Sequence, residues 1–175
     1  SLCGKIVITE NDRYCVKIQT ENLAVARKYF TLLRKTFNIR AEVSVRKSRE
    51  VRFYSVIVSK DPEARRLLGE TCLLDKDGNV SECMSPMHHR LLRQNCCRRA
   101  FIRGAFLAVG SVSDPKKSYH FEIVCTAPEK ARQLQELLAS YDVDAKVVLR
   151  KRHYVVYIKE GSQIVELLGL MGAHI

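Results

Sequence analysis

Tryptophan is absent from this 175-residue sequence, and proline and glycine are sparse, with 4 and 8 residues. No apolar run approaches the ~18 residues that suggest a membrane span. Ser1–Tyr14 already carries charged residues, which excludes a secretory signal. Hydrophobic residues make up 46% of the chain and charged residues 28%, a globular composition. These features exclude membrane-spanning, collagen-like and coiled-coil proteins.

Cysteine pairs with the C-x-x-C spacing are also missing, although the chain has seven cysteines. Zinc ribbons and thioredoxin-like sites depend on that spacing. We therefore expect reduced cysteines that act as small apolar side chains in the cytoplasm, with no metal and no cofactor. A Cys72–Cys83 disulfide in an oxidising environment stays open.

Basic residues outnumber acidic ones, 30 against 19, for a formal net charge of +11. Such a surface attracts polyanions, of which nucleic acid comes first and acidic lipid second. A basic surface without a partner is the alternative. Charge alone therefore favours nucleic acid only slightly.

An internal repeat relates Tyr14–Gly69 to Tyr119–Gly169. Tyr14 aligns with Tyr119 and Ile18 with Ile123, and the matches continue in order to the final Leu-Leu-Gly of each copy. Gaps are short and fall in expected turns. Chance does not explain so many ordered matches.

Each copy has the pattern strand, helix, hairpin and short helix. In the first copy Tyr14, Val16 and Ile18 alternate with polar residues, which predicts a half-buried strand. Thr20 is the expected N-cap of the next helix, and Asp61 that of the short helix ending at Gly69. The sequence predicts an α+β domain in which two pseudo-symmetric copies share one antiparallel sheet.

Residues 71–95 form the expected linker between the copies. Asp75–Asn79 predicts a turn. The segment resembles an EF-hand loop, but Gly78 occupies the fourth position where the sixth is required, so we reject calcium. The adjacent His88 and His89 are interpreted as solvated surface.

A helix over Cys96–Val109, capped by Asn95, precedes the second copy. Small residues recur every four positions, so they line one face and permit close approach of another backbone. The residues expected to pack there, together with the glycine that ends the motif, are Ala100, Gly104, Ala108 and Gly110. An ordinary buried Ala/Gly-rich helix is the alternative.

The stretch Ile102–Gly110 resembles a degenerate LAGLIDADG motif, the signature of a homing-endonuclease superfamily. The wider Cys96–Tyr119 segment resembles the WhiA family of bacterial DNA-binding regulators of sporulation and cell division, as do Asp75–Asn79 and Gly172–His174. This resemblance covers essentially the whole chain. It implies a saddle-shaped antiparallel sheet with helices on one face, and motif helices that pack at a pseudo-twofold axis and deliver metal-binding carboxylates.

Two departures from the superfamily pattern matter. The acid of the motif, one residue before its final glycine, is Val109 here, and valine cannot ligate Mg²⁺. The nearby Asp114 precedes a proline and is interpreted as a turn residue. Ser1-Leu2 resembles Ser111-Val112, so the first motif helix is expected to be absent, as is the helix-turn-helix domain that follows residues like Gly172–His174 in WhiA.

One pseudo-twofold domain over residues 1–175 is therefore predicted, with repeat one at 1–70, the linker at 71–95, and the motif helix and repeat two at 96–175. The favoured function is a non-catalytic domain of a nucleoid-associated regulator that gives auxiliary DNA contact and docks a protein partner. An active metal-dependent endonuclease and an RNA-binding or small-ligand α+β module are the alternatives. Val109 argues against the first. The lack of a phosphate loop and of an RNP-type aromatic pair argues against the second.

Strand alternation assigns side chains to the face of the sheet away from the helices. In repeat one it selects Lys17, Gln19, Glu42, Ser44 and Arg46. Weak, largely non-specific duplex contact is expected through basic residues on this face and on the loops Arg46–Arg52 and Arg150–His153. The candidates are Lys17, Arg46, Lys47, Arg49, Arg52, Lys146, Arg150, Lys151 and Arg152. The second copy's face carries Val124, Val148, Val155 and Tyr157 and is expected to receive protein or the missing helices.

Overall fold

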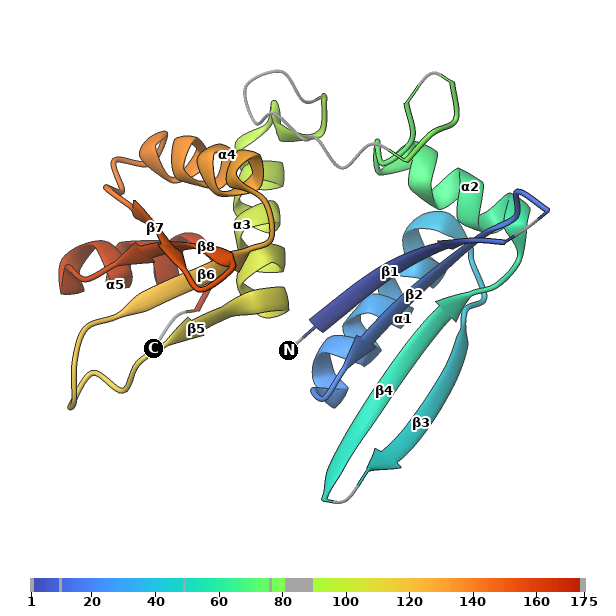
Figure 1. The fold of residues 1–175 in the computed structure, drawn as a ribbon, viewed down its shortest axis with the longest axis horizontal. Coiled ribbons are helices and arrows are strands. Elements are labelled where there is room, and N and C mark those ends of the chain that lie inside the picture. The colour runs from blue at the N-terminus through green and yellow to red at the C-terminus, as the bar shows by residue number, and fades with distance from the viewer. Residues whose placement is uncertain (1, 10, 49, 76, 81–89, 174–175) are drawn as a thin grey trace. The chain divides into compact units, whose positions relative to one another are not determined.

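A computed structural model describes residues 2–9, 11–48, 50–75, 77–80 and 90–173. The chain divides into two compact units, Ser1–Ser81 and Glu82–Ile175, each of which holds one copy of the repeat (Figure 1). Among the described residues, no helix is long and apolar enough to cross a bilayer.

The first unit is a four-stranded antiparallel sheet with helices α1 and α2 on one face (Figure 1). The strands follow the order β1-β2-β4-β3. In chain order the elements are β1 (Leu2–Ile8), β2 (Tyr14–Thr20), α1 (Leu23–Phe37), β3 (Glu42–Ser48), β4 (Val51–Val58) and α2 (Asp61–Glu70).

The second unit repeats this arrangement in the order β5-β6-β8-β7, which confirms the internal repeat at the level of topology. Helix α3 precedes the sheet, and α4 and α5 correspond to α1 and α2. The elements are a 3₁₀ turn (Arg90–Leu92), α3 (Asn95–Val109), β5 (Gly110–Val112), β6 (Phe121–Cys125), α4 (Pro128–Ala139), β7 (Lys146–Arg150), β8 (His153–Ile158) and α5 (Gly161–Leu170).

Each unit has its own hydrophobic core between its sheet and its helices. In the first, Leu33 of α1, Val56 of β4 and Leu68 of α2 are almost completely buried. In the second, Phe121 of β6 and Leu138 of α4 occupy the corresponding region. Each such side chain contributes about 1.5–3 kcal/mol on removal from water, so each copy can bury a core of its own.

One shared sheet was expected from the sequence, and neither β1 nor β5 was predicted. Instead, the described strands pair in two separate sheets, because each copy completes its ladder with its own edge strand. Gly4 lies opposite Ile18, and Gly110 lies opposite Ile123, its equivalent. Strand pairing therefore aligns Lys5, not Ser1, with Ser111, which corrects the sequence alignment by four residues.

Three predicted caps are wrong in detail. Thr20 remains in β2, and Asn22 caps α1 by accepting the Ala24 N–H at 2.9 Å. Asn95 lies inside α3 and accepts a hydrogen bond from the Tyr141 hydroxyl. Asp61 is the first residue of α2, but its carboxylate accepts the Tyr14 N–H at 2.6 Å instead of capping the helix. Tertiary partners therefore bind the side chains of Asp61 and Asn95, whereas Thr20 accepts the N–H of the neighbouring Asn22.

The Asp61 contact predicts acid sensitivity of the first unit. The Tyr14 N–H, followed by Arg65, holds the pKa of Asp61 below its ordinary value. The contribution to stability is present above the ordinary carboxyl pKa of about 4 and is lost as pH falls through the lowered value. Urea denaturation between about pH 5 and pH 2 should show a smaller loss of stability for Asp61→Asn than for the wild type. Equal losses would contradict this assignment.

The predicted turn at Asp75–Asn79 is confirmed. The Asp75 carboxylate accepts the Asn79 N–H at 2.8 Å, and Gly78 adopts a φ of 82°, which glycine tolerates best. The Tyr14 hydroxyl donates to the Gly78 carbonyl at 2.6 Å. This part of the linker therefore packs on repeat one. Cys83, His88 and His89 lie outside the described residues.

Candidate nucleic-acid interface

Helix α3 buries one face and exposes the other. Ile102 is completely buried, and the Phe106 ring stacks on Phe121 with centroids 5.0 Å apart. Ala100 and Gly104 are exposed, and a Cβ built on Gly104 would meet no atom within 4 Å. The small-residue face predicted for helix packing is therefore uncovered in the described residues, and its packing role stays a prediction.

The position of the motif acid lies at the C-terminal end of α3. Val109 occupies it with 41% of its surface exposed. By the strand register, Cys3 holds the equivalent place in repeat one, directly before Gly4. Asp114 accepts the Lys116 N–H in a turn beyond β5, as expected. The described residues contain no group of three potential metal ligands.

The sheet face opposite the helices, here called the open face, is polar and basic in repeat one. The register and the burial pattern place Lys17 and Gln19 of β2 and Arg46 of β3 on it, as the alternation predicted. Lys5 of β1 lies directly opposite Lys17 on the same face. Lys5 was not among the predicted contacts because β1 was not predicted, since the apolar run Ile6–Ile8 shows no polar alternation.

The open face of repeat two carries a carboxylate that was not among the predicted site residues. Glu122 of β6 lies 3.0 Å from His120 Nε2 and 3.2 Å from Arg150 Nη1. The His120 hydrogen bond, together with the Arg150 charge, holds the pKa of Glu122 below its ordinary value. Arg150, a predicted phosphate contact, is thus partly neutralised within its own sheet. Comparing charges at equivalent repeat positions would have found Glu122, which corresponds to Lys17.

The basic segment Arg46–Arg52 is mostly strand and not the long loop expected, since β3 runs to Ser48 and β4 begins at Val51. Alternation along these strands separates its charges. Arg46 lies on the open face, whereas Lys47 and Arg52 are paired on the opposite side. Arg49 lies outside the described residues. The hairpin therefore cannot present all its cations to one surface.

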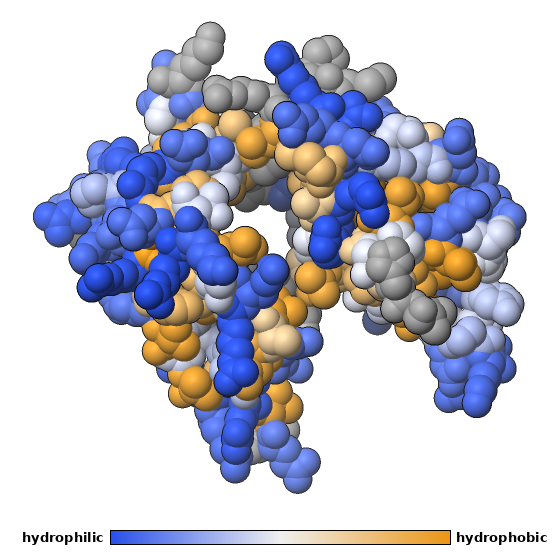
Figure 2. Space-filling view, turned by 180° about the vertical axis from the view of Figure 1, so that it is seen from behind, coloured by the Kyte–Doolittle hydropathy of each residue, from blue (hydrophilic) through white to orange (hydrophobic). Residues whose placement is uncertain are grey.

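Apolar residues accompany the cations on these hairpins. Val43 and Val45 of β3 are 54% and 60% exposed, and Leu149 of β7 is 60% exposed. The β3–β4 hairpin, which projects at the bottom of Figure 2, accordingly shows hydrophobic surface beside hydrophilic residues. In repeat two, Lys146 lies on the open face with Arg150, and Lys151 and Arg152 form the turn between β7 and β8.

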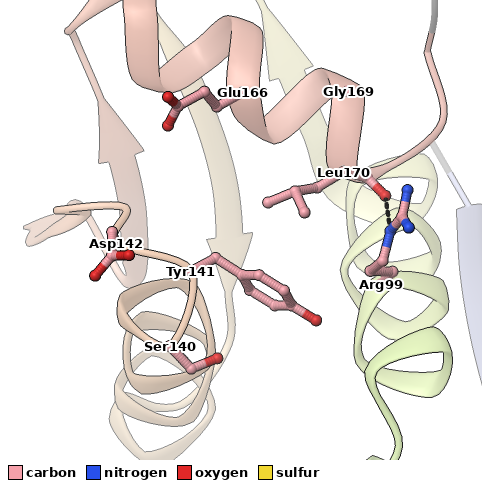
Figure 3. A pocket seen from close by; sticks show the side chains of 7 residues that line it. All are labelled: Arg99, Ser140, Tyr141, Asp142, Glu166, Gly169 and Leu170. Atoms are coloured by element: carbon pink, nitrogen blue, oxygen red, sulfur yellow. Dashed lines mark hydrogen bonds between the residues drawn. The ribbon is translucent and has the colours of Figure 1, made fainter.

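An open depression of about 500 Å³ lies between α3, the end of α4 and α5 (Figure 3). Arg99 of α3 faces it but donates to the Leu170 carbonyl at 2.8 Å. Asp142 and Glu166 lie across from Arg99, and their carboxylates do not converge with it on one point (Figure 3). This arrangement fastens α3 to α5 and offers no constellation for catalysis.

Comparisons with known proteins give consistent results. Residues 1–74 match the WhiA N-terminal LAGLIDADG-like domain, and residues 98–175 match the WhiA LAGLIDADG-like domain. A probable cell division protein WhiA from Lachnoclostridium phytofermentans is 46% identical over 99% of this chain, and one from Alkaliphilus metalliredigens is 37% identical over 99%. The chain spans 56% of each of these relatives.

Solved structures confirm the predicted fold. The crystal structure of the N-terminal LAGLIDADG domain of WhiA aligns with a TM-score of 0.68 at 19% identity, covering 98% of this chain and 76% of that chain. The homing endonuclease I-DmoI, in complex with DNA and Mn, aligns with a TM-score of 0.64 at 16% identity, covering 98% and 90%. At these identities the likeness concerns the fold alone.

Proposed function

Because the chain belongs to the WhiA family of LAGLIDADG-like proteins, we propose that it is a non-catalytic, DNA-contacting domain of a bacterial regulator of sporulation and cell division. The observation that carries this proposal is a LAGLIDADG-like fold that keeps basic residues on its open sheet faces while its motif helix lacks the acid. Since the chain spans little more than half of its relatives, the activity of the whole protein is part of the proposal.

The non-catalytic assignment rests on the motif positions. Val109 and its equivalent Cys3 provide no carboxylate oxygen, and Mg²⁺ requires oxygen ligands to activate water for phosphodiester cleavage. Of the described acids of repeat two that follow Val109, Asp114 is engaged in its turn and Glu122 is paired with Arg150, so neither replaces the motif acid. This favours a domain that retained the fold and lost cleavage.

DNA contact is supported by charge and by fold. The chain carries a net charge of +11, and Lys5, Lys17, Arg46 and Lys146 lie on open sheet faces. I-DmoI, which shares the fold, has been solved with DNA. Phosphate contacts position a protein and carry little sequence information. The domain would therefore assist binding on the nucleoid in the cytoplasm, and a helix-turn-helix elsewhere in the protein would read the sequence.

Protein docking is the second part of the proposed function. Val124 and Val148 expose apolar surface on the open face of repeat two, beside the buried Val155, and a phosphate backbone cannot use such a surface. A partner segment with apolar side chains would complement it. The uncovered Ala100 and Gly104 face of α3 would in turn pack against the first motif helix, which would join both repeats into one pseudo-twofold domain.

A cleavage assay tests the non-catalytic assignment. We expect no nicking of supercoiled plasmid with Mg²⁺ or Mn²⁺, by the wild type or by Val109→Asp. The substitution restores a carboxylate at one motif position only, and the equivalent position is still Cys3. Arg46→Ala serves as the control, since a contaminating nuclease would give equal nicking in all three preparations. Metal-dependent nicking that survives purification and weakens in Arg46→Ala would favour an active nuclease.

A comparison of RNA and duplex DNA binding tests the RNA-binding alternative. Tighter binding of RNA than of duplex DNA would favour that alternative.

A further inference from the structure

Equivalent rows of side chains cross the two open faces, and they carry different charges. In repeat one the row from edge to edge is Lys5, Lys17, Ile57 and Glu42. In repeat two the equivalent row is Ser111, Glu122, Tyr157 and Lys146. Two adjacent cations in one copy are thus replaced by a hydroxyl and a carboxylate in the other. The pseudo-symmetry of the backbone does not extend to the charge of these faces.

Lys5 and Lys17 form a like-charge pair directly across two antiparallel strands. Such pairs destabilise a sheet unless a counter-ion sits between or above them. Within the described residues, no carboxylate is recorded at ion-pair distance from either ammonium. Glu42 stands in the same row, but Ile57 intervenes, and the Glu42 carboxylate accepts from the Ser59 hydroxyl. Among the described residues the pair therefore has no counter-ion, and it suits an external anion.

The next row of each face differs in the same sense. In repeat one this row is Gln19, Ser55 and Ser44, of which Ser55 is buried and the other two are accessible. The equivalent row of repeat two is Val124, Val155 and Val148, of which Val155 is buried. Hydroxyl and amide groups can bond to phosphate and sugar oxygens, whereas valines cannot. Arg46 lies beyond this polar row, four residues from the Lys5–Lys17 row along β4 and thus about 13 Å away along the strand.

We infer that Lys5 and Lys17 form a phosphate-binding pair through which repeat one, and not repeat two, holds duplex DNA. The inference rests on the proposed DNA contact and assigns it to one of the two copies. Lys5 and Lys17 each bind a phosphate group, Gln19 and Ser44 contact the adjoining backbone, and Arg46 binds a third phosphate. Glu122 acts in repeat two as a built-in counter-ion that occupies Arg150 and repels phosphate.

Fluorescence anisotropy with a labelled duplex at several salt concentrations tests this inference. The test variant is Lys5→Ala/Lys17→Ala, and the matched control is Lys28→Ala/Lys35→Ala, which removes two exposed charges from α1 on the helix side of the same sheet. We expect the test variant to bind roughly tenfold more weakly at low salt and to reduce the salt slope by about 1.8, the value for two lost contacts. The control should change affinity less than about twofold.

A gain-of-function variant gives an independent readout. Glu122→Gln removes the counter-ion and frees Arg150, so we expect DNA affinity to rise severalfold. Circular dichroism of each variant checks that the fold is retained. A DNA affinity of Glu122→Gln equal to that of the wild type would overturn the counter-ion role of Glu122.

The possible failures are distinguishable. If the wild type binds duplex DNA and Lys5→Ala/Lys17→Ala binds equally well, the inference fails and the proposed DNA contact stands. Equal losses in the test and control variants would also overturn the inference, because net charge alone would then explain binding. A wild type that binds no duplex DNA would refute both. If Lys5→Ala/Lys17→Ala weakened the binding of single-stranded RNA but not of duplex DNA, the assignment of the pair to DNA would be overturned.

Discussion

Duplex DNA is expected to bind this chain with a Kd of roughly 10⁻⁴–10⁻⁶ M at physiological salt, and about 40-fold more weakly at 200 mM than at 50 mM salt. The estimate assumes that three cations of the repeat-one open face, Lys5, Lys17 and Arg46, each displace counter-ions from phosphate. Because phosphate contacts dominate, sequence preference should be small. Anisotropy titrations with several unrelated duplexes measure both properties. A salt-independent affinity would contradict a phosphate-based interface.

The basic hairpins provide the matched comparison for this prediction. Arg46→Ala/Lys47→Ala should weaken binding through Arg46 alone, because Lys47 lies on the other side of the sheet. Arg150→Ala/Lys151→Ala should have the smaller effect, since Glu122 already pairs with Arg150. Single Lys47→Ala and Arg46→Ala variants separate the two contributions. Wild-type binding by both double variants would show that these hairpins do not contact DNA and would shift the role of the domain toward protein partners.

Gly110→Ala is expected to lower the free energy of unfolding by about 1–3 kcal/mol, the usual cost of forcing extra atoms into a packed site. A Cβ at this position would lie 2.3 Å from Phe106 Cδ2 and 2.7 Å from the Phe106 carbonyl oxygen. Phe106 cannot move freely because its ring stacks on the buried Phe121. Denaturant titration of the chain measures the change.

Gly104→Ala is the control for Gly110→Ala, since both glycines belong to the same motif. Nothing lies within 4 Å of a Cβ on Gly104, so alanine should stabilise α3 by up to about 1 kcal/mol through its higher helix propensity. Destabilisation by Gly104→Ala in this chain would show that its helix face is already covered. Opposite signs for the two variants would separate the local role of Gly110 from the open packing face.

Much of the fold could be predicted from local patterns. The alternation of Tyr14, Val16 and Ile18 predicted both the strand β2 and the face that packs on the helices, because side chains alternate strictly in any strand. The motif helix was predicted within one residue of its observed bounds. The resemblance of Ile102–Gly110 to the LAGLIDADG motif identified Val109 as the residue at the position of the acid. The periodicity of side chains along a strand or a helix is a local property and does not depend on tertiary contacts.

Features that depend on distant neighbours were not predictable in the same way. Asp61 is a reasonable helix cap by local rules, but its carboxylate accepts a hydrogen bond from the N–H of Tyr14, 47 residues away. Glu122 and Arg150 are 28 residues apart, and only the pairing of β6, β8 and β7 brings them together. The seven-residue basic loop became two strands whose register divided its charges between opposite faces.

The sequence by itself determined the repeat, the element types, the family resemblance and the loss of the motif acid, since each is written in residue types and spacings along the chain. Only the tertiary structure decided which cations share a surface. Strand pairing placed Lys5 opposite Lys17, with no carboxylate among the described residues at ion-pair distance from either. It also brought Arg150 beside Glu122, with which it forms an ion pair. Charges act through space over a few ångströms, and distance in space is set by register and not by separation in sequence.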